Sequence, residues 1–180
     1  IPEVINVAAD GRVKDMLSRK TAEGGECCTM VADLGCGAGG LLMAISKEYP
    51  HPQYHGFDIS TQALEKAAYA VAKHKRHNVF FHNASQKGQS LGDFQHHFDL
   101  ILTYDVLHDA AHPRELICQV RRALKPGGVW LLADIPAKPT LRENIKEIPA
   151  TYFAFSMNLC MSCALSEEGG EGLGTLGFRV

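Results

Sequence analysis

Short apolar runs alternate with amphipathic stretches along most of the chain. Apolar runs of four to seven residues are typical of buried parallel strands, and apolar positions three and four apart are typical of helices. The pattern predicts five strands, at residues 30–34, 54–59, 78–82, 98–103 and 128–134. It predicts three helices between them, at residues 39–49, 61–75 and 113–124. This alternation indicates βαβ crossovers, so we expect an α/β fold with a doubly wound, Rossmann-like, mostly parallel sheet.

Residue types at the ends of these segments support the boundaries. Pro50 stops the first helix, and Ser60 is suited to cap the second because its hydroxyl can accept a backbone N–H bond. The stretch Leu124-Lys-Pro-Gly-Gly128 predicts a turn that stops the third helix before the fifth strand. After Asp134 a helical, aromatic-rich segment and a glycine-rich tail replace the alternation. We therefore expect a helical lead-in at 1–26, an α/β domain at 27–135 and a helical cap at 136–180.

The charges of the chain are nearly balanced, which limits its partners. Lysine and arginine number 18, aspartate and glutamate number 20, and the formal net charge is −2. This balance gives no electrostatic attraction to nucleic acid or to an anionic membrane, and no apolar run approaches the ~20 residues that span a bilayer. We expect no nucleic-acid or membrane partner and a cytoplasmic location. The chain begins without Met, so we also expect it to be a piece of a longer protein.

The cysteines do not form the pattern of a disulfide framework. The pair Cys160-x-x-Cys163 could be half of a zinc site or a redox pair, but no second pair at metal-site spacing accompanies it. We expect reduced, buried thiols and predict no metal-ligating residues. The six cysteines lie at positions 27, 28, 36, 118, 160 and 163. Several histidines are scattered and expected at the surface: His51, His55, His74, His77, His96, His97 and His112.

The sequence VADLGCGAGG, residues 31–40, places four glycines between the first predicted strand and the first predicted helix. That position favours a nucleotide-binding turn, in which glycine lets the backbone approach a ligand closely. No Gly-Lys-Ser/Thr follows, which excludes a phosphate-binding P-loop. Gly35, Gly37 and Gly40 fit the dinucleotide pattern, with an acidic residue about 20 residues later at Asp58.

Asp33, two residues before the first glycine, discriminates between the possible ligands. A carboxylate at the end of the strand would repel a pyrophosphate, whereas it would attract a cationic ligand. S-adenosylmethionine carries an α-ammonium and a sulfonium, so it suits this charge better than NAD. The position of Asp33 therefore disfavours an NAD-dependent oxidoreductase.

Four motifs follow one another along the chain: Asp33-Leu-Gly-Cys-Gly-Ala-Gly39, Gly56-Phe-Asp-Ile-Ser60, Phe98-Asp-Leu-Ile-Leu-Thr-Tyr-Asp-Val-Leu-His108 and Leu124-Lys-Pro-Gly-Gly-Val-Trp-Leu131. In this order they resemble the class I S-adenosylmethionine-dependent methyltransferases. The resemblance implies S-adenosyl-L-methionine, or S-adenosyl-L-homocysteine as product, with both ribose hydroxyls bound by Asp58. It implies these cofactor-binding residues: Asp33, Gly35, Cys36, Gly37, Gly39, Asp58, Ile59, Asn83, Ala84, Ser85, Tyr104 and Asp105.

The chain departs from the family pattern in two places. Family members often carry an acidic residue after the third strand that bonds to the adenine amino group, and His82-Asn-Ala-Ser-Gln86 has none. Asn83, Ser85 and backbone groups of Ala84 would read the adenine edge instead. The family sheet also ends with a sixth and an antiparallel seventh strand, for which almost nothing remains after Gly177. We expect a sheet truncated before these strands.

His108, directly after the fourth predicted strand, is the candidate catalytic residue. A His-Asp pair at this place resembles the small-molecule O-methyltransferases, in which the histidine deprotonates a hydroxyl. The alternative is a structural histidine near the cofactor. The tail at 165–174 resembles a subset with an N-terminal winged-helix domain, which would place the 140–165 helices over the active site as a lid. Four side chains of that segment would then face substrate or, alternatively, pack as core: Tyr152, Phe153, Phe155 and Met157.

Together these observations predict an enzyme that transfers a methyl group from S-adenosylmethionine to an oxygen or nitrogen of a small molecule. A protein or nucleic-acid methyltransferase is an alternative, although the chain has no basic stripe and no Asn/Asp-Pro-Pro-Tyr/Phe motif after the fourth strand. A non-catalytic S-adenosylmethionine-binding module is the other alternative, favoured by the missing adenine acid and the truncated sheet. An oligomer is compatible with the sequence.

Overall fold

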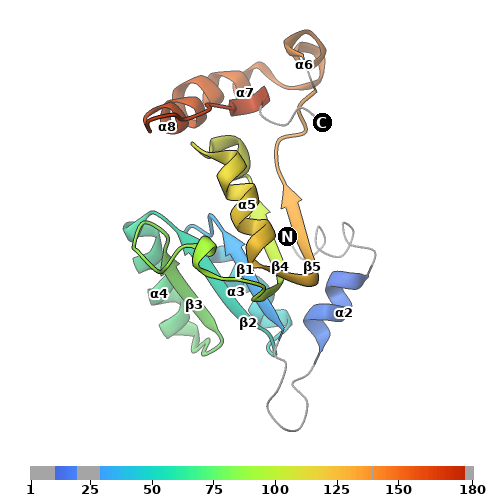
Figure 1. The fold of residues 1–180 in the computed structure, drawn as a ribbon, viewed down its shortest axis with the longest axis vertical. Helices are drawn as coiled ribbons and strands as arrows, with labels where there is room; N and C mark the ends of the chain where they lie inside the picture. The colour runs from blue at the N-terminus through green and yellow to red at the C-terminus, as the bar shows by residue number, and fades with distance from the viewer. Residues whose placement is uncertain (1–10, 20–28, 139, 177–180) are drawn as a thin grey trace. The chain divides into compact units, whose positions relative to one another are not determined.

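Five strands form one sheet in the order β3-β2-β1-β4-β5 (Figure 1). β1 pairs with β2, and β2 with β3, in parallel. The order changes direction between β1 and β4, the kind of switch point at which open α/β sheets bind ligands beyond the carboxyl ends of their strands. The predicted α/β fold with a Rossmann-like sheet is confirmed. The strands are β1 (Met30–Leu34), β2 (Gln53–Asp58), β3 (Val79–Asn83), β4 (Phe98–Tyr104) and β5 (Leu124–Ala133).

The structure, a computed structural model, describes residues 11–19, 29–138 and 140–176. Contacts group the chain into two compact units. The first unit comprises Ile1–Leu102 and Gln119–Leu131, and the second comprises Thr103–Cys118 and Leu132–Val180. Strands β4 and β5 each begin in the first unit and end in the second.

The predicted helical lead-in at 1–26 is described only at residues 11–19. These residues carry the short helix α2 (Arg12–Ser18). The rest of the lead-in, together with Cys27 and Cys28, lies outside the described residues.

The three predicted crossover helices are confirmed. Ser60 caps α4 as expected, because its Oγ accepts a hydrogen bond from the N–H of Ala63 at 3.3 Å. The cap lies directly after the end of β2, so it fixes where the chain leaves the sheet. The helices are α3 (Gly40–Glu48), α4 (Thr61–His74) and α5 (Pro113–Ala123).

The start of β5 differs from its prediction. The turn predicted at 124–128 is wrong, because these residues belong to β5, which follows α5 without a gap. Pro126 favours extended backbone in the residue before it, and Gly127 adopts a φ of 79°, which an L side chain rarely takes. The ion pair between Lys125 Nζ and Asp99 Oδ2, 2.7 Å long, then ties this end of the strand within the first unit.

The core of the first unit joins α2 and α3 to the sheet. Fully burying each large apolar side chain contributes about 1.5–3 kcal/mol, so this cluster stabilises β1 and β2 in the register that pairs Asp33 with Gly56. This register determines how far each of the two strands extends at its carboxyl end. Its fully buried members include Val13, Leu17, Val31, Leu42, Tyr54 and Leu100.

Histidines and phenylalanines form a second cluster in the first unit. His55 of β2 and His82 of β3 have nearly parallel rings, and His55 Nδ1 lies 2.9 Å from His82 Nε2. Phe94, His97 and Phe98 surround His55 at ring-centroid distances of 5.6–6.4 Å. The surface position predicted for His55 and His97 is wrong, since both are partly buried in this cluster.

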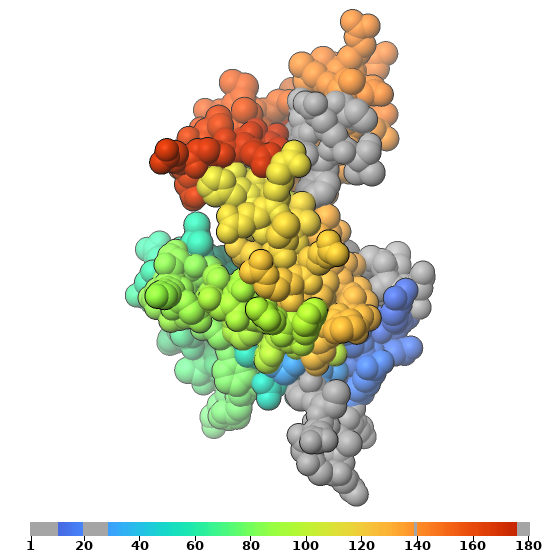
Figure 2. All heavy atoms as spheres, in the orientation of Figure 1, coloured from blue at the N-terminus to red at the C-terminus, as the bar shows by residue number. Residues whose placement is uncertain are grey.

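Helices follow β5 in the second unit. The stretch between α7 and α8 is π-helical. This form is rare in proteins, and where it occurs it is often found at functional sites. The elements are α6 (Leu141–Glu147), α7 (Ala150–Phe155), the π-helical η3 (Ser156–Cys160) and α8 (Met161–Leu165). The segment from α7 to α8, red in Figure 2, lies at the surface of this unit.

Aromatic and methionine side chains of this helical segment, for which core packing was one prediction, are exposed. Tyr152, Phe155 and Met157 are 47%, 61% and 69% exposed, so their interpretation as core is wrong. Their contact with substrate stays a prediction. The cysteines differ from expectation in the same way, because Cys118 and Cys163 are exposed.

The histidine cluster makes stability depend on pH. Burial, and then the charges of His82 and His97, lower the pKa of His55 from 6.5 to about 4. Folding therefore favours the neutral ring, whose contribution is complete above pH 6.5 and is lost as the pH falls through 4. We expect the free energy of unfolding to fall by about 2–3 kcal/mol over this window. His55→Gln should reduce that fall, as measured by urea unfolding.

The matched control for this substitution is His77→Gln, because His77 is exposed. It should leave the pH dependence of unfolding unchanged. Equal slopes for wild type and His55→Gln in this pH window would contradict the assignment of the effect to His55.

Candidate active site

β1 ends in the glycine turn, and backbone hydrogen bonds tie this turn to β2. The N–H groups of Gly35 and Cys36 both donate to the carbonyl oxygen of Phe57, at 2.8 and 3.1 Å. Gly35, Gly37 and Gly39 have φ angles of 72°, 52° and 76°, in the left-handed region that favours glycine. The glycines are therefore required by the course of the turn itself.

Asp58, the last residue of β2, holds the turn with its carboxylate. Oδ2 accepts a hydrogen bond from the N–H of Gly37 at 2.7 Å, and Oδ1 accepts one from the N–H of Ser60 at 2.8 Å. Each carboxylate oxygen can accept a second donor. The group therefore remains able to bind two neighbouring hydroxyls, which is the arrangement predicted for the ribose.

Asp33 is the second carboxylate of this region and is 3% exposed. Burial, and then the charge of Asp58, raise the pKa of Asp33 to about 7. A buried carboxylate is costly as an anion unless a cation or donors compensate it. A cationic group bound near Asp33 would favour the ionised form, in agreement with the predicted ammonium partner.

Two glycines leave room for the ring of Phe81 beneath the turn. A Cβ on Gly39 would collide with Cζ of this ring. A Cβ on Gly56 would lie 2.6 Å from Phe81 Cδ1 and 2.8 Å from Cys36 Sγ. The ring of Phe81 in β3 thus packs against the glycine turn and against β2, in the space that side chains at Gly39 and Gly56 would occupy.

The residues predicted to contact adenine, Asn83 to Ser85, lie at the end of β3 and directly after it, beside the end of β2. The N–H of Ala84 donates to the carbonyl oxygen of Asp58 at 2.9 Å, and the N–H of Ser85 donates to Asn83 Oδ1 at 3.1 Å. Ile59 has a 70% exposed side chain. The structure therefore brings these four residues to the same strand ends as Asp58, and leaves an exposed apolar side chain there for a planar ring.

The remaining predicted residues belong to the second unit, at the end of β4 and in the turn after it. Tyr104 is 62% exposed, and Asp105 has a φ of 60° while its N–H donates to the carbonyl oxygen of Ala133 at 2.8 Å. The short 3-10 helix η2 (Leu107–Asp109) follows and buries His108, which is 4% exposed.

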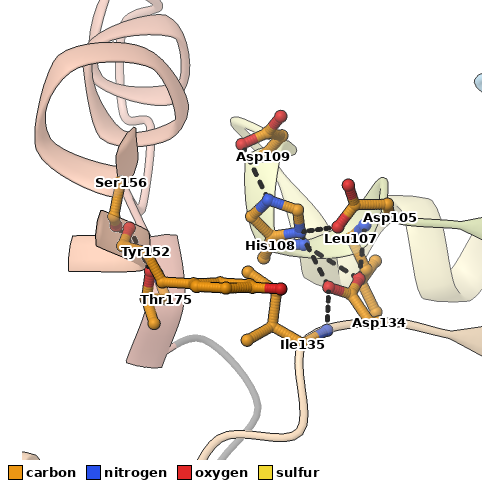
Figure 3. Close-up of polar contacts among 9 residues, drawn as sticks. All are labelled: Asp105, Leu107, His108, Asp109, Asp134, Ile135, Tyr152, Ser156 and Thr175. Carbon is orange, nitrogen blue, oxygen red and sulfur yellow. Dashed lines mark hydrogen bonds and ion pairs between the residues drawn. The ribbon is translucent and has the colours of Figure 1, made fainter. Parts of the chain in front are cut away.

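Asp134, just after β5, fixes the ring of His108 (Figure 3). Asp134 Oδ1 lies 2.7 Å from His108 Nδ1 and accepts the N–H of Ile135 at 2.8 Å. Asp134 Oδ2 accepts the N–H groups of Leu107 and His108 at 3.0 and 3.3 Å. Since Asp134 is an acceptor in each contact, Nδ1 is the ring nitrogen that donates, and Nε2 is left for other partners.

This pairing shifts the pKa values of both groups. The hydrogen bond to Asp134 raises the pKa of His108 against the effect of burial, and the charges of Asp134, Asp109 and Asp105 add to the rise. Burial alone would raise the pKa of Asp134, but the bonds from His108 and Ile135 outweigh it and lower that pKa. An ionised carboxylate beside a readily protonated imidazole is the favoured state.

Two further groups meet the other side of the ring. His108 Nε2 lies 3.2 Å from Asp109 Oδ1. Burial, and then a hydrogen bond to Asp109, raise the pKa of the Cys160 thiol to about 12. Asp134 and Cys160 were both missed by sequence reasoning about His108, although an acidic residue at the end of the fifth predicted strand was a signal for the first.

A substitution in the glycine turn tests its packing. Gly39→Ala places a Cβ against the Phe81 ring at a φ of 76°, so we expect a loss of about 2–3 kcal/mol in the free energy of unfolding. Gly40→Ala is the matched control, because a Cβ there meets nothing within 4 Å and the residue begins α3. Alanine at this helical position should be neutral or stabilising by up to about 1 kcal/mol. Equal unfolding free energies for the two variants would contradict the described turn.

Comparisons with known proteins agree with this geometry. A family described as a methyltransferase domain matches residues 32–130, more than half of the chain. The malonyl-[acyl-carrier protein] O-methyltransferase of Halalkalibacterium halodurans is 28% identical over 68% of this chain and 45% of its own length. The ribosomal RNA small subunit methyltransferase C of Haemophilus influenzae is 31% identical over 65% of this chain and 36% of its own length. The chain thus spans less than half of each of these relatives.

Solved structures give the same result. Phosphoethanolamine N-methyltransferase 2 of Haemonchus contortus, in complex with S-adenosyl-L-methionine, has a TM-score of 0.56 and 28% identity over 75% of this chain and 30% of its own. The chain belongs to the methyltransferase-domain family, the class I enzymes that transfer a methyl group from S-adenosylmethionine.

Proposed function

We propose that this chain methylates an oxygen or nitrogen of a small molecule, with His108 as the base that takes the acceptor's proton. The observation that carries the proposal is the buried His108–Asp134 pair. Asp134 holds Nδ1 at 2.7 Å, and this contact directs the lone pair of the neutral ring to Nε2. Such a pair is suited to an acceptor that must lose a proton before or during methyl transfer.

The cofactor side of the proposal rests on the first unit. When bound, S-adenosylmethionine supplies a methyl group on a positively charged sulfur. The buried Asp33 suits its ammonium group, the open lone pairs of Asp58 suit the ribose hydroxyls, and exposed Ile59 suits the adenine ring. The other residues of this unit that we propose to hold it are Gly35, Cys36, Gly37, Gly39, Asn83, Ala84 and Ser85. The contacts expected from Tyr104 and Asp105, which belong to the second unit, stay a prediction.

The base side rests on the second unit. Asp109 lies 3.2 Å from Nε2, a contact that requires the ring to be protonated, because a carboxylate can only accept. Loss of that proton frees the lone pair, and an acceptor O–H or N–H can then donate to Nε2 in place of Asp109. His108 Nε2 would take the acceptor's proton as the acceptor atom bonds to the methyl carbon and the bond from that carbon to sulfur breaks, with S-adenosylhomocysteine as the leaving group. Asp134 would stabilise the resulting imidazolium.

The charge of the chain disfavours a nucleic-acid acceptor. Relatives of this chain are named for an acyl-carrier-protein substrate and for ribosomal RNA, so the family alone leaves the acceptor open. The formal net charge of −2 gives this chain no attraction to a phosphate backbone. In the described part of the chain, no helix is long and apolar enough to cross a membrane.

Binding of the cofactor depends on Asp58. Asp58→Ala removes two hydrogen bonds to a charged acceptor, each contributing about 1.5–3 kcal/mol. We expect the affinity for S-adenosylmethionine to fall by about 10²-fold or more, measured by calorimetry. Glu65→Ala, which removes an exposed carboxylate of α4, should leave that affinity unchanged. Unaltered binding to folded Asp58→Ala would exclude the proposed ribose contact.

Turnover depends on His108. His108→Asn should lower methyl transfer by about 10²–10⁴-fold, because it removes the base while an amide N–H can still reach Asp134. Transfer is measured with methyl-labelled S-adenosylmethionine and a metabolite extract, alongside separate protein and RNA fractions. His112→Asn is the control, since the His112 side chain is 43% exposed and should not affect turnover.

Three results bear on this assignment. Label that enters the small-molecule fraction and is lost in His108→Asn would support it. Label confined to the protein or RNA fraction would contradict the acceptor class. Undiminished labelling by His108→Asn would contradict the role of the base.

A further inference from the structure

Three different metal-ligand types meet on the Nε2 side of His108, within the second unit. They are the imidazole of His108, the carboxylate of Asp109 and the thiol of Cys160. One ligand atom from each lies within 4.8 Å of the other two, and Nε2 lies 3.2 Å from Asp109 Oδ1. Figure 3 shows Asp109 facing this nitrogen, with Asp134 on the opposite nitrogen.

The orientation of His108 is already that of a metal ligand. Metal-binding histidines nearly always donate their second ring N–H to a carboxylate or carbonyl, which fixes the tautomer and aims the free nitrogen. Asp134 makes this contact at 2.7 Å, and its side chain is 5% exposed. The ring is therefore held with Nε2 directed at Asp109 before any ligand binds.

A second set of donors around the same ring is less suitable. Asp105 and Asp134 lie on the Nδ1 side, and they also have metal-compatible spacing. However, Asp134 accepts bonds from the N–H groups of Leu107, His108 and Ile135. A metal there would compete with these bonds and with the Nδ1 contact. A metal on the Nε2 side would leave these bonds and the Nδ1 contact intact, and would replace the contacts that Asp109 makes with Nε2 and with the Cys160 thiol.

The donor types on the Nε2 side select the class of metal. Nitrogen, oxygen and sulfur ligands suit zinc and related thiophilic divalent ions, whereas magnesium and calcium prefer oxygen. With bonds of about 2.0–2.2 Å, a tetrahedral zinc ion separates its nitrogen and oxygen ligands by about 3.4 Å, close to the 3.2 Å seen here. Three protein ligands would leave one position open.

Cys160 belongs to a helical segment that is held by local hydrogen bonds. Cys160 is the last residue of the π-helical stretch, in which Ser156 Oγ accepts the N–H of Thr175 at 2.8 Å. Ser162 Oγ also donates to the carbonyl oxygen of Met157, five residues back, at 2.9 Å. Cys163, three residues further on, is exposed and is not in the group.

We propose that His108, Asp109 and Cys160 form a binding site for a thiophilic divalent metal ion of the zinc type. The site goes beyond the proposed function, because the ion needs neither cofactor nor acceptor to bind. Binding displaces the thiol proton of Cys160 and occupies the lone pair of Nε2. The bound ion would therefore block His108 as a base, so zinc should inhibit any turnover that uses it.

The test is titration of the whole chain with Cd²⁺, a thiophilic probe, in the absence of cofactor and acceptor. We expect one equivalent to bind and to produce the ultraviolet thiolate-to-cadmium absorption band. Cys160→Ser should abolish the band from this equivalent, and Cys163→Ser, the matched control on the same helical segment, should retain it. Asp134→Asn should weaken binding by about 10–100-fold, the effect typical of removing an outer-shell partner.

Two results would overturn the proposal. One is the absence of a stoichiometric cadmium–thiolate band in the wild-type chain. The other is a band that survives Cys160→Ser or disappears in Cys163→Ser, with circular dichroism showing that each variant is folded. Either result leaves the role of His108 in turnover to its own experiment, because no methyl transfer is measured here.

Discussion

The hydrogen bond between the N–H of Gly37 and the carboxylate of Asp58 is the contact on which the cofactor region depends. It joins the turn after β1 to the end of β2 at 2.7 Å. Because the glycines of the turn adopt left-handed φ angles, their backbone needs such an anchor to keep one course. Each oxygen of this carboxylate can accept a second hydrogen bond from a ligand. One side chain therefore both stabilises the turn and offers hydrogen-bond acceptors to the ligand.

The same device recurs at the end of β5. Asp134 follows that strand and accepts backbone N–H groups from the turn after β4, as Asp58 does for the turn after β1. In each case a carboxylate at the end of one strand, or just after it, holds the turn that follows the neighbouring strand in the sheet. The first such turn carries the glycines that we propose to contact the cofactor, and the second carries His108, whose Nε2 is the atom proposed both as base and as metal ligand.

The sequence was sufficient for features that depend on local patterns. The spacing of apolar residues and the length of the apolar runs predicted the strands and crossover helices, and the position of Ser60 predicted the cap of α4. It was insufficient where the partner lies far along the chain. The Asp134–His108 contact and the approach of Cys160 to Asp109 depend on tertiary packing, and the cluster around His55 depends on the register of β2 with β3. The predicted turn at 124–128 failed because Pro126 and Gly127 are accommodated within β5, where Gly127 adopts a positive φ that glycine permits.

The central claim of this account is that the ligand near the glycine turn is positively charged, because two carboxylates lie there. Asp33 is buried and its pKa is raised to about 7, because a buried carboxylate is costly as an anion; a bound cation would offset this cost, and a pyrophosphate would add to it. Calorimetric titration of the chain with S-adenosylmethionine and with NAD tests this most directly. We expect S-adenosylmethionine to bind and NAD to give no measurable heat. Binding of NAD with comparable affinity, or no binding of S-adenosylmethionine, would contradict it.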